Sequence, residues 1–158
     1  MQITVGSAVV NSPKRKPPGQ PWQIWYDAED FLPPGRNGLK DFRNLKVWDK
    51  AHTLALACYA VTSNFPKEEL FGLVSQIRRS GSSIGANIAE GCGRGSNADF
   101  QRFLNMAMGS ACELEYQLLL AKDLHHLGPG EHQQTHELVV EIKRMLAALI
   151  RKIDSERK

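Results

Sequence analysis

The stretch SSIGANIAEGCGRGSNADF, residues 82–100, decides between two very different folds. Gly91, Gly93 and Gly95 form a G-x-G-x-G pattern of the kind found in loops that bind nucleotide phosphates. Such a loop follows a β-strand and precedes a helix, and a P-loop also needs a lysine. Here the preceding residues have a helical pattern, and the loop offers only Arg94. We therefore interpret the stretch as a turn between two helices.

On both sides of this turn, apolar residues recur at spacings of three and four, which indicates amphipathic helices. The sequence predicts four of them: one that ends before Pro66, one over about 67–90 with an apolar stripe from Leu70 to Ile88, one that starts at Ser96, and one after residues 126–132. No segment alternates with a period of two for long enough to form a strand. Short connections favour antiparallel neighbours, so we predict an all-α fold, an antiparallel up-down-up-down four-helix bundle.

Several residues suggest where the second and third helices end and begin. Gly91 is expected to stop the second helix, and Ser96 with Asp99 three residues later resembles a capping box for the third. Gly81 and Gly85 lie inside the second helix, where each would weaken an isolated helix by up to about 1 kcal/mol relative to alanine. We expect another backbone to approach closely at these two glycines.

The first 40 residues differ from the rest of the chain. They contain six of the eight prolines and show no sustained period, so we interpret 1–40 as a flexible extension and 41–158 as the bundle. The extension also carries four aromatic residues: Trp22, Trp25, Tyr26 and Phe31. Two alternatives stay open for them, stray side chains in an unstructured tail or docking against another surface. In either case we expect the extension to be dispensable for folding.

The composition excludes several classes of protein. A net charge of +3 is too small to indicate nucleic-acid binding by itself. Cys58, Cys92 and Cys112 are odd in number and form no C-x-x-C motif, so neither zinc nor a disulfide framework is expected. No apolar run approaches the roughly 18 residues of a membrane span, and no basic segment precedes the short run ITVGSAVV as in a signal peptide. We expect a reduced, cytoplasmic protein.

Histidines cluster near the predicted last turn. His132 and His136 are four residues apart, and His125 and His126 lie across the turn, a spacing compatible with a metal site. However, the E-x-x-H motif of di-iron bundles does not occur. We interpret these residues as solvated histidines and predict no metal and no cofactor.

The second and third helices each carry a polar stripe beside the apolar one. Arg79 and Glu113 fall near the middles of adjacent antiparallel helices, which makes a buried or half-buried ion pair possible. Catalysis would need paired carboxylates, but Glu113 and Glu115 face different sides of a helix. We therefore assign Gln76, Arg79, Asn87 and Glu113 structural or interface roles and predict no catalytic residue. The surplus of semi-polar surface predicts a closed homo-oligomer.

Charge separates between the two ends of the predicted bundle. One end, the basic pole, combines the start of the first helix, the glycine turn and the end of the fourth helix. Its basic residues are Arg43, Lys46, Lys50, Arg94, Arg102, Arg144, Arg151, Lys152, Arg157 and Lys158. Its acidic residues are Asp41, Asp49, Glu90, Asp99, Asp154 and Glu156. Ten basic against six acidic residues make a net charge of +4.

The opposite end is acidic, with a net charge of −3 from two basic and five acidic residues: Lys67, Lys122, Glu68, Glu69, Asp123, Glu131 and Glu137. The first eight basic residues of the basic pole, from Arg43 to Lys152, are candidates for binding RNA or DNA. The start of the third helix adds free backbone N–H groups and the positive end of a helix dipole, which suit a phosphate.

Three motifs carry a resemblance to a known family: DFRNLKVWDKAH at 41–52, FPKEELFGLVSQIRRSGSSIGANIAEGCGRGS at 65–96 and FLNMAMGSACELEYQL at 103–118. Together they resemble the four-helix-bundle proteins encoded in intervening sequences of large-subunit rRNA genes. The accessory proteins of diversity-generating retroelements look like members of the same fold. The resemblance covers about Asp41 to Lys152, and the residues before Leu39 have no counterpart in it, which leaves translation from near Leu39 open as an alternative.

The resemblance implies a homo-oligomeric ring, typically a pentamer, without enzymatic activity. For the retroelement branch it also implies binding of nucleic acid beside a reverse transcriptase. Two functions therefore stay open: a nucleic-acid-binding accessory ring that acts through the basic pole, and a protein-interaction scaffold whose charges only keep it solvated. The expected partners are further copies of the chain, RNA or DNA, and a reverse transcriptase, but no membrane.

Overall fold

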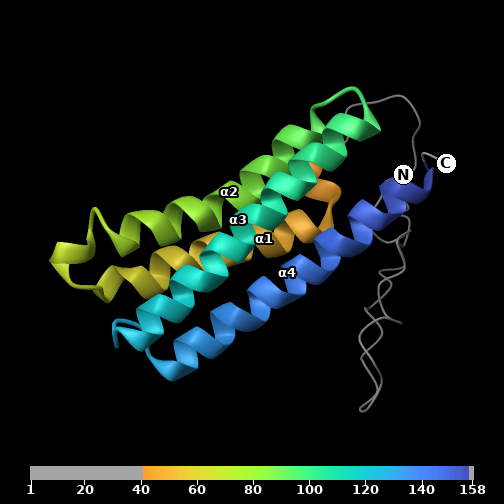
Figure 1. Cartoon of the computed structure of the whole chain (residues 1–158). Helices are drawn as coiled ribbons and strands as arrows, with labels where there is room; N and C mark the ends of the chain where they lie inside the picture. The colour runs from red at the N-terminus through yellow and green to blue at the C-terminus, as the bar shows by residue number, and fades with distance from the viewer. Residues whose placement is uncertain (1–40, 157–158) are drawn as a thin grey trace, which may run out of the picture.

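The computed structural model describes residues 41–156, which form the four-helix bundle drawn in Figure 1. The long helices are α1 (Lys46–Val61), α2 (Leu73–Cys92), α3 (Asn97–Asp123) and α4 (Pro129–Glu156). Three short 3₁₀ helices accompany them: η3 (Phe42–Asn44), η4 (Thr62–Asn64) and η5 (Lys67–Glu69). No strand occurs within the described range, so the predicted all-α fold is confirmed. The predictions about residues 1–40, Arg157 and Lys158 lie outside it.

The four helices surround a single hydrophobic core. Each packs against its neighbours in the chain, and α1 also packs against α4, as Figure 1 shows. Every helix contributes an apolar stripe whose central side chains are fully buried: Leu54, Ile84, Leu114 and Leu146. Burying one such side chain contributes about 1.5–3 kcal/mol relative to leaving it exposed. The periodic apolar positions are therefore what holds the four helices together.

The start of α2 differs from the sequence prediction. The helix begins at Leu73, whereas residues 67–69 form a separate 3₁₀ turn. Gly72 adopts a non-helical backbone conformation (φ −95°, ψ −116°) and interrupts the helical run. The Glu69 carboxylate accepts a hydrogen bond from the Leu73 backbone N–H at 3.0 Å, which satisfies one free donor of the new helix. The interruption removes Leu70 from the apolar stripe and leaves it 51% exposed.

The end of α2 also differs. We expected Gly91 to stop the helix, but the helix continues to Cys92, and Gly93 follows it with ordinary right-handed geometry (φ −79°, ψ −4°). Gly91 is needed for space instead. A Cβ atom there would lie 2.9 Å from Cδ2 of Phe100 and 2.9 Å from Cβ of Phe103. The glycine lets the first turns of α3 pack directly against the end of α2.

The prediction for the start of α3 is confirmed. Ser96 is the N-cap residue, and its hydroxyl oxygen accepts a hydrogen bond from the Asp99 backbone N–H at 3.1 Å. This contact satisfies one of the free N–H groups of the first turn. At the start of α4, Pro129 occupies the first helical position, where its missing N–H costs nothing.

Gly81 and Gly85 do not face a neighbouring backbone, contrary to expectation. A Cβ atom on Gly81 would lie 3.0 Å from the Sγ atom of Cys58, a side chain of α1. A Cβ atom on Gly85 would meet the Trp48 indole at 3.7 Å, which is an ordinary contact. Of these two glycines, only Gly81 is required for close packing, and its nearest neighbour is a side chain rather than a backbone.

Candidate nucleic-acid interface

The fold brings together the elements that were predicted to form the basic pole. The start of α1, the turn between α2 and α3 and the end of α4 lie at the same end of the bundle in Figure 1. All eight candidate residues in the described range are exposed or half-buried: Arg43, Lys46, Lys50, Arg94, Arg102, Arg144, Arg151 and Lys152. Arg144 lies close to the midpoint of α4, however, so it is remote from the pole itself.

Several basic side chains of the pole are already paired with carboxylates. Arg43 lies 3.4 Å from Asp41, and Arg94 forms an ion pair with Glu90 one helical turn before it. The ammonium of Lys50 lies 3.2 Å from a carboxylate oxygen of α4, that of Glu141, which the sequence did not assign to this pole. Because Arg144 is remote from the pole, seven basic against six acidic described side chains leave a net charge of +1. The internal pairs reduce the field of the pole further.

Two arginines at the start of α3 share one aromatic ring. The guanidinium carbons of Arg94 and Arg102 lie 4.8 Å and 5.1 Å from the centroid of the Phe103 ring. Phe103 itself is only 4% exposed, so it supports the two cations from below. The first turn of α3 adds the positive end of a helix dipole at this end of the bundle, where Ser96 caps one N–H and Asp99 contributes a carboxylate. The arrangement suits an anion such as a phosphate group.

The opposite end of the bundle keeps the predicted acidic excess. It holds the connection between α1 and α2 and the connection between α3 and α4 (Figure 1). Two basic against five acidic residues leave a net charge of −3 there, and Glu69 also lies 3.9 Å from Nε2 of His126. The two ends of the described bundle therefore differ in charge sign.

The predicted ion pair between α2 and α3 forms, but it is not buried in the single chain. Nη2 of Arg79 lies 3.7 Å from Oε1 of Glu113, and the two side chains are 73% and 47% exposed. Of the two possibilities, a buried or a half-buried pair, the single chain does not show the buried one, because both side chains lie on the outer edge of the α2–α3 contact. Of the other two residues assigned to this group, Gln76 is exposed, whereas Asn87 is half-buried and donates to the Ser83 carbonyl at 2.9 Å.

A buried polar contact beneath this pair was missed by the sequence prediction. The Ser80 hydroxyl on α2 donates to Oε1 of Gln117 on α3 at 2.6 Å, and the Gln117 amide donates to Glu113 at 3.0 Å. Ser80 and Gln117 are only 2% and 4% exposed. Their positions beside the apolar stripes were the available signal, but only the rotation of the two helices decides that they meet.

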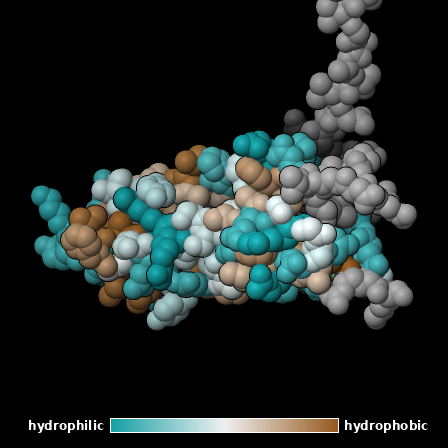
Figure 2. Space-filling view, turned by 90° about the horizontal axis from the view of Figure 1, so that it is seen from above, coloured by the Kyte–Doolittle hydropathy of each residue, from teal (hydrophilic) through white to brown (hydrophobic). Residues whose placement is uncertain are grey.

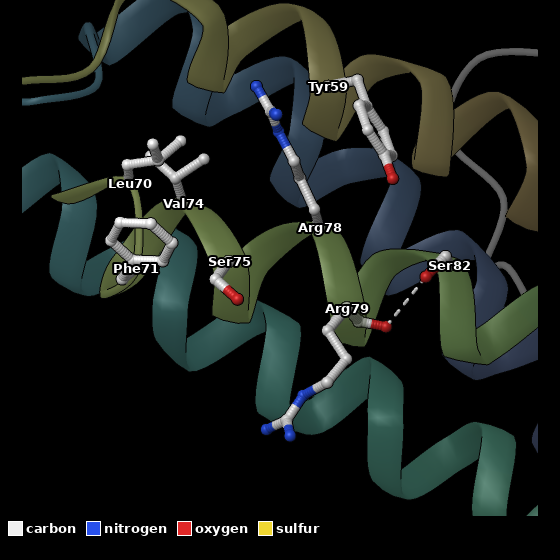
Figure 3. A pocket seen from close by; sticks show the side chains of 8 residues that line it. All are labelled: Tyr59, Leu70, Phe71, Val74, Ser75, Arg78, Arg79 and Ser82. Atoms are coloured by element: carbon white, nitrogen blue, oxygen red, sulfur yellow. Dashed lines mark hydrogen bonds between the residues drawn. The ribbon is translucent and has the colours of Figure 1, made fainter. Parts of the chain in front are cut away.

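The acidic end also carries a groove between α1 and α2, shown in Figure 3. It has a volume of about 450 Å³, and Tyr59, Leu70, Phe71, Val74 and Arg78 line it. The hydrophobic side chains at its mouth are unusually exposed, Phe71 by 92% and Tyr59 by 51%. Figure 2 shows hydrophobic side chains gathered at the corresponding end of the molecule. The sequence prediction missed this groove because it placed Leu70 inside the second helix.

Arg78 is held in place within this groove. Its Nε donates to the hydroxyl of the buried Thr62 at 2.9 Å, and its guanidinium lies 4.8 Å from the ring centroid of Tyr59. In Figure 3, Arg78 points toward α1, whereas Arg79 points toward α3. The two adjacent arginines of α2 therefore serve different surfaces.

The histidines and other titratable groups form no constellation for metal binding within 41–156. His132 and His136 stack with ring centroids 5.7 Å apart, and Nδ1 of His136 lies 3.7 Å from the Glu115 carboxylate. The same carboxylate accepts a hydrogen bond from Lys143 at 2.6 Å, which raises the pKa of that amine. Burial lowers the pKa of His132, so its imidazole is neutral near pH 7.

The remaining observations concern the cysteines and the membrane. Burial raises the pKa of the Cys58 thiol to about 12, so it stays protonated and unreactive. Cys92 is also buried and Cys112 is exposed, and all three are free thiols. Within the described range no helix combines the length and apolar character needed to cross a membrane.

Comparisons with known proteins agree with the resemblance found in the sequence. The family model of the 23S rRNA-intervening sequence protein matches residues 43–148, well over half of the chain. The chain is also similar to a protein of unknown function from the S23 ribosomal protein family of Bacteroides thetaiotaomicron VPI-5482, whose crystal structure is known. The two sequences are 33% identical, and their structures align with a TM-score of 0.62. The match covers 66% of this chain and 95% of that one.

The search of curated proteins gives no match. The relation to retroelement accessory proteins stays a prediction. The family match, by contrast, covers α1, α2, α3 and α4 as far as residue 148, and so includes the polar α2–α3 contact. The chain therefore belongs to the family of 23S rRNA-intervening sequence proteins.

Proposed function

We propose that this chain is a non-enzymatic nucleic-acid-binding protein that works as a closed homo-oligomer and contacts phosphates with its basic pole. The separation of charge carries the proposal. The described bundle has 13 basic and 14 acidic residues, so its net charge of −1 would not attract a polyanion. A net charge of +1 at the basic pole against −3 at the other end would orient a nucleic acid toward one end.

The chemistry of the pole favours phosphates over bases. Arg94 and Arg102 share the ring of Phe103 at the start of α3, and guanidinium donors suit phosphate oxygens. The aromatic ring between them, Phe103, is buried and offers no face for stacking a base. We therefore expect binding with little sequence preference and a strong dependence on salt.

A ring would strengthen this effect by repeating the basic pole around its axis. The outer face of α2 and α3 is the best candidate for the contact between copies. It combines the Arg79–Glu113 pair with two exposed side chains of α3, Met106 at 49% and Tyr116 at 63%. Such a mixture of apolar and charged groups is typical of surfaces that meet another protein.

A mobility-shift titration across a range of salt concentrations tests the nucleic-acid proposal. A 23S rRNA fragment, an unrelated RNA and duplex DNA serve as probes. Changing Arg94, Arg151 and Lys152 together to glutamate should abolish binding and leave the oligomer intact, because all three are surface residues of the pole. The control, Lys67→Glu with Lys122→Glu, alters the opposite end and should change little. Failure of the unaltered protein to bind any probe at low salt would reject the proposal.

A protein-interaction scaffold is the second candidate, and the exposed Leu70 and Phe71 favour it. If no nucleic acid binds, this function takes the place of the first. The gene neighbourhood separates the biological settings. A reverse transcriptase gene with a template repeat nearby would indicate a retroelement accessory factor, whereas an rRNA locus would indicate the other setting.

A further inference from the structure

We propose that the N-terminal segment Trp22–Leu32 of this chain docks in the groove between α1 and α2, with its acidic side chains on Arg78. The groove needs a partner that supplies both apolar and anionic groups. The segment supplies both at close spacing, and it belongs to the same chain.

The apolar half of the groove is unfilled by residues 41–156. Phe71 is 92% exposed and Leu70 is 51% exposed at one end of the groove, and Tyr59 of α1 lies at the other end, beyond Arg78 (Figure 3). Contiguous exposed aromatic and aliphatic groups of this kind usually mark a binding surface, since covering them removes apolar area from water. The groove therefore fits large hydrophobic side chains.

The other half of the groove presents a positioned cation. Thr62 and Tyr59 hold the Arg78 guanidinium through its Nε atom and its face, which leaves the two terminal nitrogens to donate outward. Within the part of the chain that the structure describes, no carboxylate lies within ion-pair distance of Arg78, whereas Arg79 already has Glu113. A fixed guanidinium loses little entropy when it binds a carboxylate. The groove therefore favours an acidic partner.

The segment Trp22–Leu32 reads WQIWYDAEDFL and matches both halves. It contains four aromatic residues, three acidic residues and no basic residue. The rest of the extension is basic, with five lysines or arginines and no acidic residue. The groove lies at the end with a net charge of −3, but its own lining holds Arg78 and Arg79 and no carboxylate. This local charge favours the acidic segment over the basic remainder of the extension.

The chain is long enough to reach. The eight residues 33–40 span at most about 26–29 Å when extended. Tyr59 lies 13 residues beyond Lys46 on α1, a rise of about 20 Å along the helix. Because the segment is tethered, its effective concentration at the groove is in the millimolar range, so even a weak contact is occupied.

Tryptophan quenching in the full chain tests the proposal. The sequence has three tryptophans, so a Trp48→Phe variant leaves only Trp22 and Trp25 as reporters. If the segment is docked, acrylamide quenches these two tryptophans with a rate constant several-fold smaller than in a free peptide of residues 18–34. Adding Arg78→Glu should raise the constant toward that of the peptide. Arg102→Glu makes the same charge change at the basic pole and should leave it unaltered.

Arg78→Glu also removes the hydrogen bond to Thr62, so it could release the tryptophans by disturbing the bundle. Two further variants separate that effect from loss of docking. Replacing Asp27, Glu29 and Asp30 by asparagine, glutamine and asparagine alters no residue of the bundle and should release the tryptophans equally. Combining Arg78→Glu with Glu29→Arg and Asp30→Arg should restore protection.

Three results would overturn the proposal. The first is a quenching constant in the full chain equal to that of the peptide. The second is protection that disappears on dilution, which would mean that the segment binds another subunit. The third is a change in oligomer size with Phe71→Asp while the tryptophans stay unprotected throughout, which would assign the groove to a second copy of the bundle.

Discussion

At the residue scale, Gly91 lies where α3 leaves no room for a methyl group. Both contacts of a Cβ atom there would be 2.9 Å, one to a ring carbon of Phe100 and one to the Cβ atom of Phe103. The Phe103 contact cannot be relieved by rotating a side chain, because a Cβ atom moves only with its backbone. Either α2 or α3 must shift to accept the change.

We therefore expect Gly91→Ala to lower the free energy of unfolding by about 1–3 kcal/mol, the usual range for overpacking a core. Gly109→Ala is the matched control, since a Cβ atom on that mid-helix glycine of α3 would meet nothing within 4 Å. The control should raise stability by about 0.4–1 kcal/mol, because alanine reduces the entropy of the unfolded chain. Denaturant unfolding measures both, and equal effects of the two changes would contradict the steric argument.

Cys58 gives a second prediction at this scale. Its pKa rises from 9.0 to about 12 because the thiolate would be buried, so the folded chain holds this proton more tightly than the unfolded chain. This contribution to stability is complete below about pH 9 and is lost as the pH rises toward 12. A Cys58→Ala variant should therefore lose less stability between these pH values than the unaltered chain.

Thiol labelling at neutral pH provides the matching measurement. Cys112 is exposed and should react at once, whereas Cys58 and Cys92 should react only when the chain unfolds. Rapid labelling of Cys58 in the folded protein would show that the α1–α2 contact opens readily.

At the scale of the helices, α2 and α3 are joined by a polar contact inside the core. The Ser80 hydroxyl donates a hydrogen bond to Oε1 of Gln117 at 2.6 Å, and both side chains are almost completely buried. Removing the Ser80 hydroxyl leaves the buried Gln117 oxygen without this hydrogen bond, which costs about 1–3 kcal/mol. Without Gln117, the hydroxyl can still donate to the Gln76 carbonyl at 2.9 Å. The contact therefore constrains how the two helices are rotated relative to each other.

We predict that Ser80→Ala and Gln117→Leu each destabilise the bundle, and that the double variant costs less than the sum. The expected coupling lies within the roughly 0.5–3 kcal/mol found for directly interacting residues. Ser82→Ala is the control, because that hydroxyl is exposed and its loss should stay within about 0.5 kcal/mol. Additive effects in a denaturant-based cycle would mean that the two side chains act independently.

At the scale of the whole molecule, the Arg79–Glu113 pair distinguishes a single bundle from an assembly. An exposed pair contributes about 0–1 kcal/mol, whereas breaking a buried pair costs about 3–5 kcal/mol. In the single chain the pair is largely exposed. If copies meet on the α2–α3 face, as proposed, the same pair becomes buried between them.

Glu113→Gln should then shift assembly to higher protein concentration, by a larger free energy than an exposed pair supplies. Light scattering across protein concentrations measures the shift, and thermal unfolding of the dissociated form should hardly change. Glu68→Gln is the control at the acidic end, where an exposed carboxylate lies away from the proposed contact. A chain that is monomeric at micromolar concentration would rule out the assembly altogether.

The sequence by itself determined the helices, because a 3.6-residue period and local caps are properties of each segment alone. The stripes with Leu54, Ile84, Leu114 and Leu146 and the cap at Ser96 needed no knowledge of neighbours. The difference in charge between the two ends of the bundle was predictable in the same way, from the order of the helices and their alternating directions.

Contacts between helices were decided only by the tertiary structure. The space at Gly91, the exposure of Arg79 and Glu113, the Lys50–Glu141 pair and the groove at Phe71 depend on how each helix is rotated and shifted against the next. A stripe more than 100° wide tolerates a range of rotations, so it places a residue near the core without choosing its partner. That choice is made by the packing of all four helices together, since each side chain must fit the gaps left by the others.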